Sequence, residues 1–567
     1  MCCSDLPVHF DGRLYLSTAF GKVIALNPQD GRQVWTFDPE IDRSRSYSEV
    51  TSRGVSTWRD SRAGADSTCA RRVFYGTIDA RLISLDAVTG QRCATFGAQG
   101  EIDLATTLGI REKGDYQVTS PPAILGDLVI VGSSIGDNWN ANTGSGVVRA
   151  FDARTGAERW SWHPLGRDRQ GQVGAANAWS LISVDRERDL VFVPTTSPSP
   201  DFFGGLRPGN NADANSLVAL RGSTGERVWG FQTIHHDLWD YDLAAQPSLV
   251  TIRKEGQALS AVVQATKMGS LFVLDRERGT PLFPVEERPV PQTDIPGETS
   301  WPTQPFPVLP RSLMPQGPVT PDSVWGATDA DRAECRDLVS RYQSRGIFTP
   351  PTLQGTIMVP GNGAGTNWGS VAYDPVRQLL ILNMSRVATL VQLLPAGDVE
   401  RLRAESRKAG EDYEYATQRG APFGMRRRTL ETAKGIPCTA PPWGTLAAVD
   451  LVSGDVRWEV PFGQGPDEHP LTKILGSEQI GVPNAGGPLV TASGLVFIAA
   501  TLDKRFRAFD VETGRILWTT TLPRAGLATP MTYRAADGRQ MIVIAAGGHG
   551  KWGLEVGDYL MAFALPR

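Results

Sequence analysis

The sequence predicts an all-β protein, an eight-bladed β-propeller with Trp-docking repeats, and three observations lead to this fold class. A short unit recurs seven times along the chain. The 567 residues include 60 Gly and 40 Pro, which suits many short strands joined by turns better than long helices. The 15 Trp are partly periodic, because most copies of the unit carry one at the same place.

Each copy of the unit has apolar residues, usually an Asp or Asn, a turn that ends in Gly, and usually an aromatic residue four positions later. We expect a hairpin in each copy, with the acidic side chain capping the turn and Gly at a positive φ. The second copy lacks the aromatic residue, and the fourth has Arg221 in place of Asp. The turn glycines are Gly31, Gly90, Gly156, Gly225, Gly279, Gly454 and Gly514.

A single hairpin cannot bury its own faces, so the repeats are expected to form small sheets that pack around an axis, with Trp between neighbours. Most copies are about 55 to 70 residues apart, longer than a WD40 blade of roughly 40 to 45 residues. The gap from Gly279 to Asp450 leaves room for diverged blades, and residues 183–185 and 371–374 resemble further strands. We therefore predict eight blades in one domain over residues 1–567.

Two segments interrupt the repeat. The chain is dense in Pro from Pro281 to Pro321 and rich in alternating charge from Asp398 to Arg428. We expect both to be surface excursions from the propeller rather than separate domains.

Composition excludes several classes of protein. The 57 Lys and Arg against 61 Asp and Glu leave a net charge of −4, which argues against a nucleic-acid binder. No stretch has the roughly 18 uninterrupted apolar residues of a membrane span. The N-terminus does not resemble a secretory signal, and strand-like sequence begins at Leu14, so we expect that the start of a longer protein is missing and the first blade is truncated.

The six Cys form neither CxxC pairs nor a CxxCH motif, so zinc ribbons and covalent haem are not expected. Pairing of Cys69 with Cys93, or of Cys335 with Cys438, would fit an oxidising compartment. Spacing alone leaves the redox compartment open.

Two polar clusters could carry chemistry. Residues 235–242 place three carboxylates beside His235 and His236, but a strand would point the two imidazoles to opposite faces, which argues against joint metal ligation. Residues 132–139 are rich in Gly and Ser, and Asp137 or Asn138 could offer oxygen to Ca²⁺ or Mg²⁺. The alternatives are a solvated loop for the first cluster and a Gly-rich turn for the second.

These clusters and several isolated motifs occur in an order that resembles the membrane-bound quinoprotein glucose dehydrogenases, which use pyrroloquinoline quinone (PQQ). The resemblance runs from about residue 11 to the C-terminus. The motifs that carry it are Arg53–Ser56, Cys69–Arg72, Thr119–Pro122, Gly136–Asn138, Asn177–Trp179, His235–Asp240, Lys267, Gly346–Pro351 and Gly547–Gly550.

The resemblance implies a role for each matching position. Asp240 corresponds to the catalytic base, Lys267 to the cation that bonds the quinone oxygens, and Trp179 to the indole stacked on the cofactor. The implied metal ligands are Asp137, Asn138 and Asp240. The other implied cofactor contacts are Arg53, Thr119, Ser134 and Asn383.

These residue types suit the implied chemistry. An alcohol carbon that loses a hydride to the quinone must also lose its hydroxyl proton, so a carboxylate such as Asp240 is needed within hydrogen-bond reach. A Lys ammonium and a divalent cation, Ca²⁺ or Mg²⁺, make the quinone a better hydride acceptor by drawing charge onto its oxygens.

The chain also departs from the family. Members carry a His four residues before the Arg of the Arg-Gly motif, where this chain has Glu49, and this change puts glucose as the substrate in doubt. Members also have an N-terminal transmembrane anchor on the bacterial inner membrane, which we do not find in this sequence.

The resemblance implies oxidation of a sugar or cyclic polyol on the periplasmic side of that membrane. Electrons would pass to ubiquinone or another membrane acceptor. The alternatives are a quinate/shikimate or acyclic-polyol dehydrogenase on the same scaffold, and a non-catalytic propeller that binds partner proteins.

Overall fold

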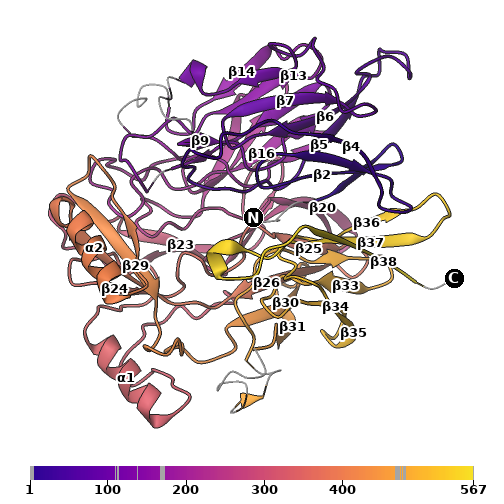
Figure 1. Ribbon diagram of the computed structural model, residues 1–567. Helices are drawn as coiled ribbons and strands as arrows, with labels where there is room; N and C mark the ends of the chain where they lie inside the picture. The colour runs from indigo at the N-terminus through magenta and orange to yellow at the C-terminus, as the bar shows by residue number, and fades with distance from the viewer. Residues whose placement is uncertain are drawn as a thin grey trace.

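A computed structural model describes residues 6–108, 110, 114–136, 138–166, 173–465, 473, 475–476 and 480–565. The protein is mostly β, and eight of its sheets succeed one another around the molecule (Figure 1). We number these sheets 1 to 8 in chain order. All strand pairs within them are antiparallel.

The first four sheets each have four strands. Sheet 1 contains β1 (Val8–Phe10), β2 (Arg13–Ser17), β3 (Val23–Leu26) and β4 (Gln33–Phe37). Sheet 2 contains β5 (Ser56–Arg59), β6 (Arg71–Gly76), β7 (Arg81–Asp86) and β8 (Glu101–Asp103). Sheet 3 contains β10 (Ala123–Leu125), β11 (Leu128–Val131), β13 (Val148–Asp152) and β14 (Glu158–Trp162). Sheet 4 contains β15 (Ser183–Asp185), β16 (Leu190–Pro194), β17 (Ser216–Arg221) and β18 (Arg227–Gln232).

The other four sheets have three or four strands. Sheet 5 contains β19 (Ser248–Lys254), β20 (Gln257–Ala265) and β21 (Leu271–Asp275). Sheet 6 contains β25 (Val371–Asp374), β26 (Leu379–Ser385), β30 (Gly444–Asp450) and β31 (Val456–Pro461). Sheet 7 contains β32 (Leu489–Val490), β33 (Leu495–Ile498), β34 (Arg505–Asp510) and β35 (Ile516–Thr521). Sheet 8 contains β36 (Met531–Arg534), β37 (Gln540–Ala546) and β38 (Tyr559–Ala564).

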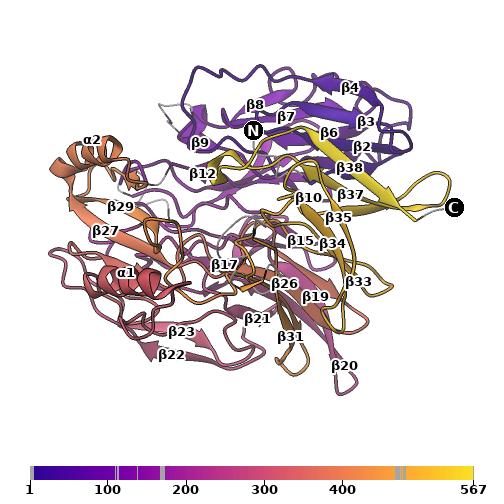
Figure 2. The ribbon, with the colours of Figure 1, turned by 60° about the horizontal axis from the view of Figure 1, so that its bottom comes forward.

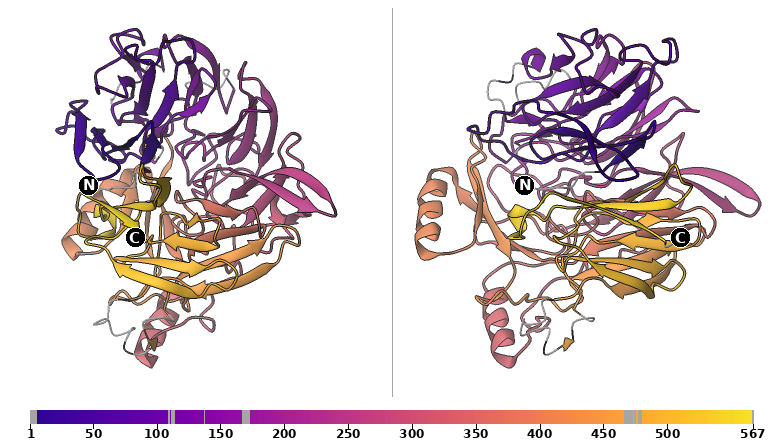
Figure 3. Two further views of the ribbon diagram at one scale, coloured as in Figure 1. Left: turned by 90° about the vertical axis from the view of Figure 1, so that its right-hand side faces the viewer. Right: turned by 45° about the vertical axis from the view of Figure 1, so that its right-hand side comes forward.

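Buried apolar side chains fill the space between each sheet and the next one along the chain. Sheet 8 in turn packs on sheet 1, where Leu14, Tyr533 and Val543 share one cluster. The Tyr533 hydroxyl also donates to the carbonyl of Pro28 at 2.5 Å. The first and last sheets therefore meet, and the eight sheets form a ring (Figure 3).

Five of the seven predicted hairpins are present, at β3–β4, β13–β14, β17–β18, β30–β31 and β34–β35. The second and fifth copies form only single bridges after the turn, Leu85 with Arg92 and Leu274 with Pro281. In the fifth copy, Pro281 and Pro284 lack the N–H group that a strand ladder needs. The predicted caps are present, since a side-chain oxygen of Asp152 accepts the backbone N–H groups two and three residues later.

Four repeat Trp side chains contact the turn of the following sheet. Each indole N–H donates to a backbone carbonyl there, at 2.7 to 3.2 Å. A Cβ on the neighbouring turn glycine would lie 2.5 to 2.7 Å from the indole, so both the contact and the positive φ require Gly. The Trp and Gly pairs are Trp35 with Gly90, Trp160 with Gly225, Trp229 with Gly279, and Trp458 with Gly514.

The two interrupting segments contain secondary structure of their own. The first includes the hairpin of β22 (Val285–Pro289) and β23 (Thr303–Pro307). The second supplies α2 (Val399–Ala409), β28 (Glu414–Ala416) and β29 (Phe423–Thr429). With β24 (Thr356–Met358) and β27 (Thr389–Pro395), these two strands form a four-stranded sheet that we call the cap sheet.

The cap sheet and α2 lie to one side of the ring (Figures 1 and 2). The remaining elements are α1 (Asp329–Ser340), the pair β9 (Tyr116–Gln117) and β12 (Ser134–Ile135), and short 3₁₀ turns at Thr106–Leu108, Ala396–Asp398 and Gly550–Trp552. Across the part of the chain that the structure describes, neither α-helix has the length and apolar character needed to cross a bilayer.

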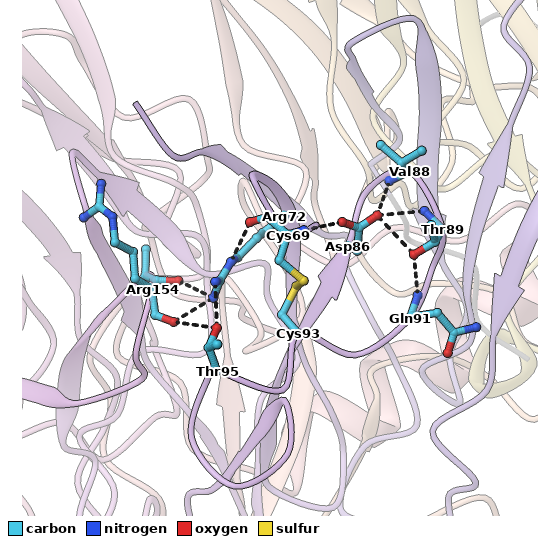
Figure 4. The surroundings of a disulfide bond; sticks show 10 residues. Cys69, Arg72, Asp86, Val88, Thr89, Gln91, Cys93, Thr95 and Arg154 are labelled. Carbon is cyan, nitrogen blue, oxygen red and sulfur yellow. Dashed lines mark hydrogen bonds between the residues drawn. A yellow bond between two sulfur atoms is a disulfide. The ribbon is translucent and has the colours of Figure 1, made fainter. Parts of the chain in front are cut away.

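Both disulfides considered from the sequence are present. Cys69 and Cys93 are joined beside β7, where the backbone N–H of Cys69 also donates to the carboxylate of Asp86 (Figure 4). Arg72 crosses from this site to the carbonyls of residues 153 and 154 in sheet 3, at 2.9 Å each. The second disulfide ties α1 to residue 438, because Cys335 bonds Cys438 across 103 residues of sequence.

We expect the Cys335→Ser, Cys438→Ser double variant to lose thermal stability, because the bond closes a loop whose entropy would otherwise favour the unfolded chain. A chain-entropy model assigns roughly 3–5 kcal/mol to loops of this size. Calorimetry of the oxidised and reduced proteins should show that reductant lowers the thermal midpoint of the wild type more than that of the variant. An equal decrease in both proteins would contradict the stabilising role.

Candidate active site

A cavity of about 630 Å³ collects side chains from segments far apart in the chain, from Phe20 to Gly550. Of the site residues predicted from the sequence, six line it together: Arg53, Ser134, Asn138, Trp179, Asp240 and Lys267. They come from loops next to sheets 2, 3, 4 and 5, and from β12. The ring therefore brings together residues that are more than 200 positions apart in sequence.

Two of the described predicted residues, Thr119 and Asn383, do not line this cavity. Thr119 lies behind Arg53 and accepts a hydrogen bond from its guanidinium at 2.8 Å. Asn383 is 4% exposed, and its amide donates to Asn484 and to the carbonyl of Gly486. Asp137 lies outside the described residues.

The turn that carries Asp240 is shaped by Asp237. One carboxylate oxygen of Asp237 accepts the N–H of Trp239 at 3.0 Å, and the other accepts the N–H of Tyr241 at 2.9 Å. Asp240 itself has a φ of +58°, in the left-handed region that Asp adopts more readily than most residues. The buried cap thus holds a left-handed turn that directs the Asp240 carboxylate into the cavity.

The two histidines of the same motif have separate partners, although they lie in bends after β18 and not in the strand that the alternation argument assumed. His235 contacts Glu287 at 3.1 Å, and the buried His236 contacts Glu298 at 2.9 Å. Neither His lines the cavity. Their role is to join the Asp240 turn to the segment around β22 and β23.

Both oxygens of the Asp240 carboxylate are engaged. Lys267 Nζ lies 3.0 Å from Oδ1, while Arg427 Nη1 and Asn362 Nδ2 lie 3.0 and 2.9 Å from Oδ2. Burial favours the neutral acid, but the two cations outweigh it and lower the pKa of Asp240 below its ordinary value. The group is therefore a carboxylate at neutral pH.

Lys267 joins two carboxylates. Its ammonium also lies 3.3 Å from Asp242 Oδ2 and donates to the backbone carbonyl of Asp240 at 2.8 Å. Burial opposes the charge, yet Asp240 and Asp242 together raise the pKa of Lys267 above its ordinary value, so it is an ammonium. Asp242 also accepts the indole N–H of Trp179 at 3.0 Å, which fixes the plane of that ring.

Arg53 and Glu49 form a further charged pair of the cavity. Arg53 Nη2 lies 3.6 Å from Glu49 Oε2, and the guanidinium carbon lies 4.7 Å from the centre of the Trp179 ring. The backbone N–H and carbonyl of Glu49 are both hydrogen-bonded to Gln117, which holds the residue at the cavity wall. The carboxylate that replaces the family His is therefore paired with a cation.

Four further residues of the site were not predicted from the sequence: Asp242, Asn362, Trp368 and Arg427. Asp242 stood in a singled-out motif but was given no role, and the other three carry no local signal of a cavity. Arg427 falls in the charged segment that we expected to be a surface excursion. That expectation was wrong for this residue, because β29 directs its side chain to Asp240.

Two of the described residues could bind a hard cation such as Ca²⁺ or Mg²⁺. Asn138 and Asp240 line the cavity and offer oxygen atoms, the donors that Ca²⁺ and Mg²⁺ prefer. Within the described ranges, no group of three His, Cys, Asp or Glu side chains is placed to hold a metal ion. Any ion bound to Asp240 would share that carboxylate with Lys267 and Arg427.

Comparison with known proteins decides the family. The family model described as the glucose/ethanol/alcohol dehydrogenase β-propeller domain, PQQ, matches residues 3–542. The chain belongs to this family of PQQ-dependent dehydrogenases. It is a quinoprotein dehydrogenase that acts on CH–OH donors.

Two curated relatives of this quinoprotein dehydrogenase match 99% of the chain. Quinoprotein glucose dehydrogenase A of Acinetobacter calcoaceticus is 38% identical, and 72% of its length is covered. Quinate/shikimate dehydrogenase (quinone) of Acinetobacter baylyi is 36% identical, and again 72% of its length is covered. Among solved structures, quinohemoprotein alcohol dehydrogenase from Comamonas testosteroni is similar with a TM-score of 0.68 at 22% identity, over 99% of this chain and 74% of that one. The structural likeness supports the propeller fold.

The cavity of the quinoprotein dehydrogenase fits a planar cofactor with several carboxylates. Trp179 offers an aromatic face, and Arg53 and Lys267 offer positive charge. The buried indole N–H of Trp368 has no hydrogen-bond acceptor among the described residues, so a ligand oxygen there would satisfy it. These are the donors that a carboxylated quinone requires.

Proposed function

We propose that this chain oxidises a hydroxyl-bearing carbon of a sugar or cyclic polyol to the lactone or ketone, with Asp240 as the base. The observation that carries the proposal is the ionised Asp240 carboxylate at the cavity wall, 3.0 Å from a buried ammonium. A base must be deprotonated and must lie within reach of the substrate hydroxyl. The Asp240 carboxylate is deprotonated, and it faces the cavity in which the substrate would bind.

PQQ, when bound, supplies the hydride acceptor. In our proposal Lys267 holds positive charge beside the cofactor, Trp179 lies against its ring, and Arg53 pairs with one of its carboxylates. Thr119 would fix the position of Arg53 by accepting a hydrogen bond from its guanidinium. Ser134 lines the same wall, and Asn383 would act through Asn484 and the Gly486 backbone rather than by direct contact.

We further propose Ca²⁺ or Mg²⁺ at Asp137, Asn138 and Asp240, and ubiquinone or another membrane acceptor for the electrons. The eight numbered sheets would be the eight blades, with the indoles docked between neighbours. The two disulfides favour an oxidising compartment, so we place the protein on the periplasmic side of the inner membrane.

Reconstitution tests the function. The purified chain, mixed with PQQ and Ca²⁺ or Mg²⁺, should reduce an artificial dye when glucose, a cyclic polyol or a hydroxy acid is added. A chelator should remove that activity, and added metal should restore it. Failure to take up PQQ would instead support the non-catalytic propeller that binds partners.

A second candidate is a quinate/shikimate or acyclic-polyol dehydrogenase. Glu49 favours it, because the glucose-type family has His at this position. A substrate panel with the reconstituted enzyme separates the candidates by kcat/KM.

Glu49 itself gives a prediction. The Glu49→Gln variant should bind PQQ up to about fivefold more tightly, because Arg53 no longer shares its charge with a half-exposed carboxylate. Fluorescence titration of the apoprotein measures this. Glu101→Gln, which removes a carboxylate paired with Arg81 elsewhere, should leave PQQ affinity unchanged.

The Glu49→His variant should move kcat/KM towards aldoses if this position shapes selectivity. An unchanged substrate profile would remove Glu49 from the argument.

A further inference from the structure

Arg427 reaches the cavity from the cap sheet, outside the ring of sheets. It is the middle residue of an Arg triplet in β29. Because side chains alternate across a strand, its two neighbours face the other way, and their guanidinium groups lie 4.5 and 4.9 Å from the Tyr413 ring. One arginine of the three, Arg427, therefore lines the cavity.

The two ends of the Arg427 guanidinium have different surroundings. Nη1 donates to Asp240 at 3.0 Å, and both of these side chains are at most 15% exposed. Nε and Nη2 donate to the two oxygens of Glu414 at 2.9 Å each, a bidentate pair. Glu414 lies directly across from Arg427 in the β28–β29 pairing, but its side chain is 66% exposed.

We call the Nε and Nη2 side of the guanidinium the fork of Arg427. Its occupant Glu414 is bidentate but 66% exposed, so water competes for this carboxylate more than for the 11% exposed Asp240. Glu414 is therefore the carboxylate that a ligand can displace, whereas Asp240 stays bound at the buried end. The fork of Nε and Nη2 matches the two oxygens of any carboxylate, including one that belongs to a ligand.

The cap sheet holds Arg427 firmly. The segment that follows β28 is bound to the loop at the cavity wall, where the N–H groups of Gln418 and Arg419 donate to the carbonyls of Asn138 and Trp139 at 3.1 and 2.9 Å. The Gln418 side chain also accepts the N–H of Phe202 at 3.0 Å. A side chain on such a rigid element can select among ligands by position.

We propose that Arg427 is a specificity-determining residue that binds a carboxylate of the substrate, and that Glu414 occupies the same fork until the substrate displaces it. The preferred substrates are then hydroxy acids, in which the carboxylate lies a few bonds from the hydroxyl to be oxidised. This inference rests on the proposed function, because Asp240 must receive the proton of that hydroxyl while Arg427 holds the carboxylate.

Opposite effects of two substitutions test the proposal. Quinate and its methyl ester are the probes, since they share a ring of hydroxyls and differ in charge. With PQQ-loaded enzyme, Arg427→Gln should raise KM for quinate at least tenfold more than it raises KM for the ester, because both substrates lose the contact of Arg427 with Asp240 but only quinate also loses its partner. Glu414→Gln should lower KM for quinate, because the internal competitor is gone.

A binding measurement keeps the test independent of turnover. Quinate, but not the ester, should raise the thermal midpoint of wild-type apoprotein, more so in Glu414→Gln and not at all in Arg427→Gln. Arg427→Lys should restore part of the shift, because it keeps the charge without the fork. The matched control is Arg428→Gln, whose side chain faces Tyr413 and should leave the shift unchanged.

Changes in the same direction for Arg427→Gln and Glu414→Gln would mean that the pair is only structural and would overturn the proposal. So would equal binding of quinate and its ester by the wild type. If the loaded enzyme oxidises no compound of the panel, the proposed function fails, while the apoprotein shifts still decide the role of Arg427.

Discussion

Asp240→Asn should reduce turnover by about 10²- to 10⁴-fold, the usual contribution of a positioned base, and leave PQQ bound. The amide has the size of the carboxylate, so the cavity is preserved, but it cannot accept a proton from an alcohol at neutral pH. Its NH₂ group would also replace the oxygen that accepts from Arg427 and Asn362. Stopped-flow reduction of bound PQQ by substrate, with a parallel PQQ titration, measures both quantities.

The matched control is Asp503→Asn, which removes the carboxylate of a buried ion pair that does not line the cavity. Asp503 and Arg507 are 7% and 3% exposed, so the loss of charge should lower stability without slowing PQQ reduction. Full activity of Asp240→Asn would show that another group takes the proton. Loss of PQQ binding in that variant would show that Asp240 holds the cofactor site together instead.

Much of the fold could be predicted from short-range patterns. A turn with Asp and Gly depends on local backbone geometry, so the hairpins at Asp152, Asp450 and Asp510 followed from neighbouring residues alone. Residues 183–185 and 371–374 also form strands as expected. The second copy fails as a hairpin where Cys93 bonds back to Cys69, a constraint that the repeat pattern does not contain.

The cap sheet could not be predicted either, because its strand pairing is also absent from the local sequence pattern. Its strands β24, β27, β28 and β29 are separated in sequence by α2 and by strands of sheet 6, and pairing across such distances leaves no periodic trace. The alternating charge near Arg427 predicts a solvated surface when only the sequence is considered. Only the three-dimensional arrangement shows that one of three arginines meets Asp240.

The candidate site was predicted by resemblance rather than by spacing. Lys267 and Trp179 are single residues with ordinary local surroundings, and the acidic cluster around Asp240 could equally have been a solvated loop, yet the structure places all three residues at one cavity. Their partner Asp242 is two positions from Asp240 but became informative only once its contacts with Lys267 and Trp179 were visible. Roles that depend on such contacts cannot be read from a single sequence.

Lys267→Met should abolish PQQ reduction and also lower stability. The ammonium is 7% exposed and lies between Asp240 and Asp242, which are 11% and 8% exposed, so its removal leaves two buried carboxylates with less positive charge. Breaking a buried ion pair in this way costs about 3–5 kcal/mol. Calorimetry and stopped-flow reduction of bound PQQ should show both effects in the variant, whereas Lys504→Met, which breaks the exposed pair with Glu555, should show neither.

A double variant separates the two roles of Lys267. Adding Asp242→Asn to Lys267→Met removes one of the two carboxylates, and the Asn oxygen can still accept the Trp179 indole N–H. Stability should therefore recover in part. Turnover should not recover, because the ammonium that stabilises the negative charge developing on the quinone oxygens would still be missing. Recovery of both stability and turnover would mean that Lys267 acts only by neutralising buried acids. The metal ion or Arg427 would then have to stabilise the negative charge on the quinone oxygens.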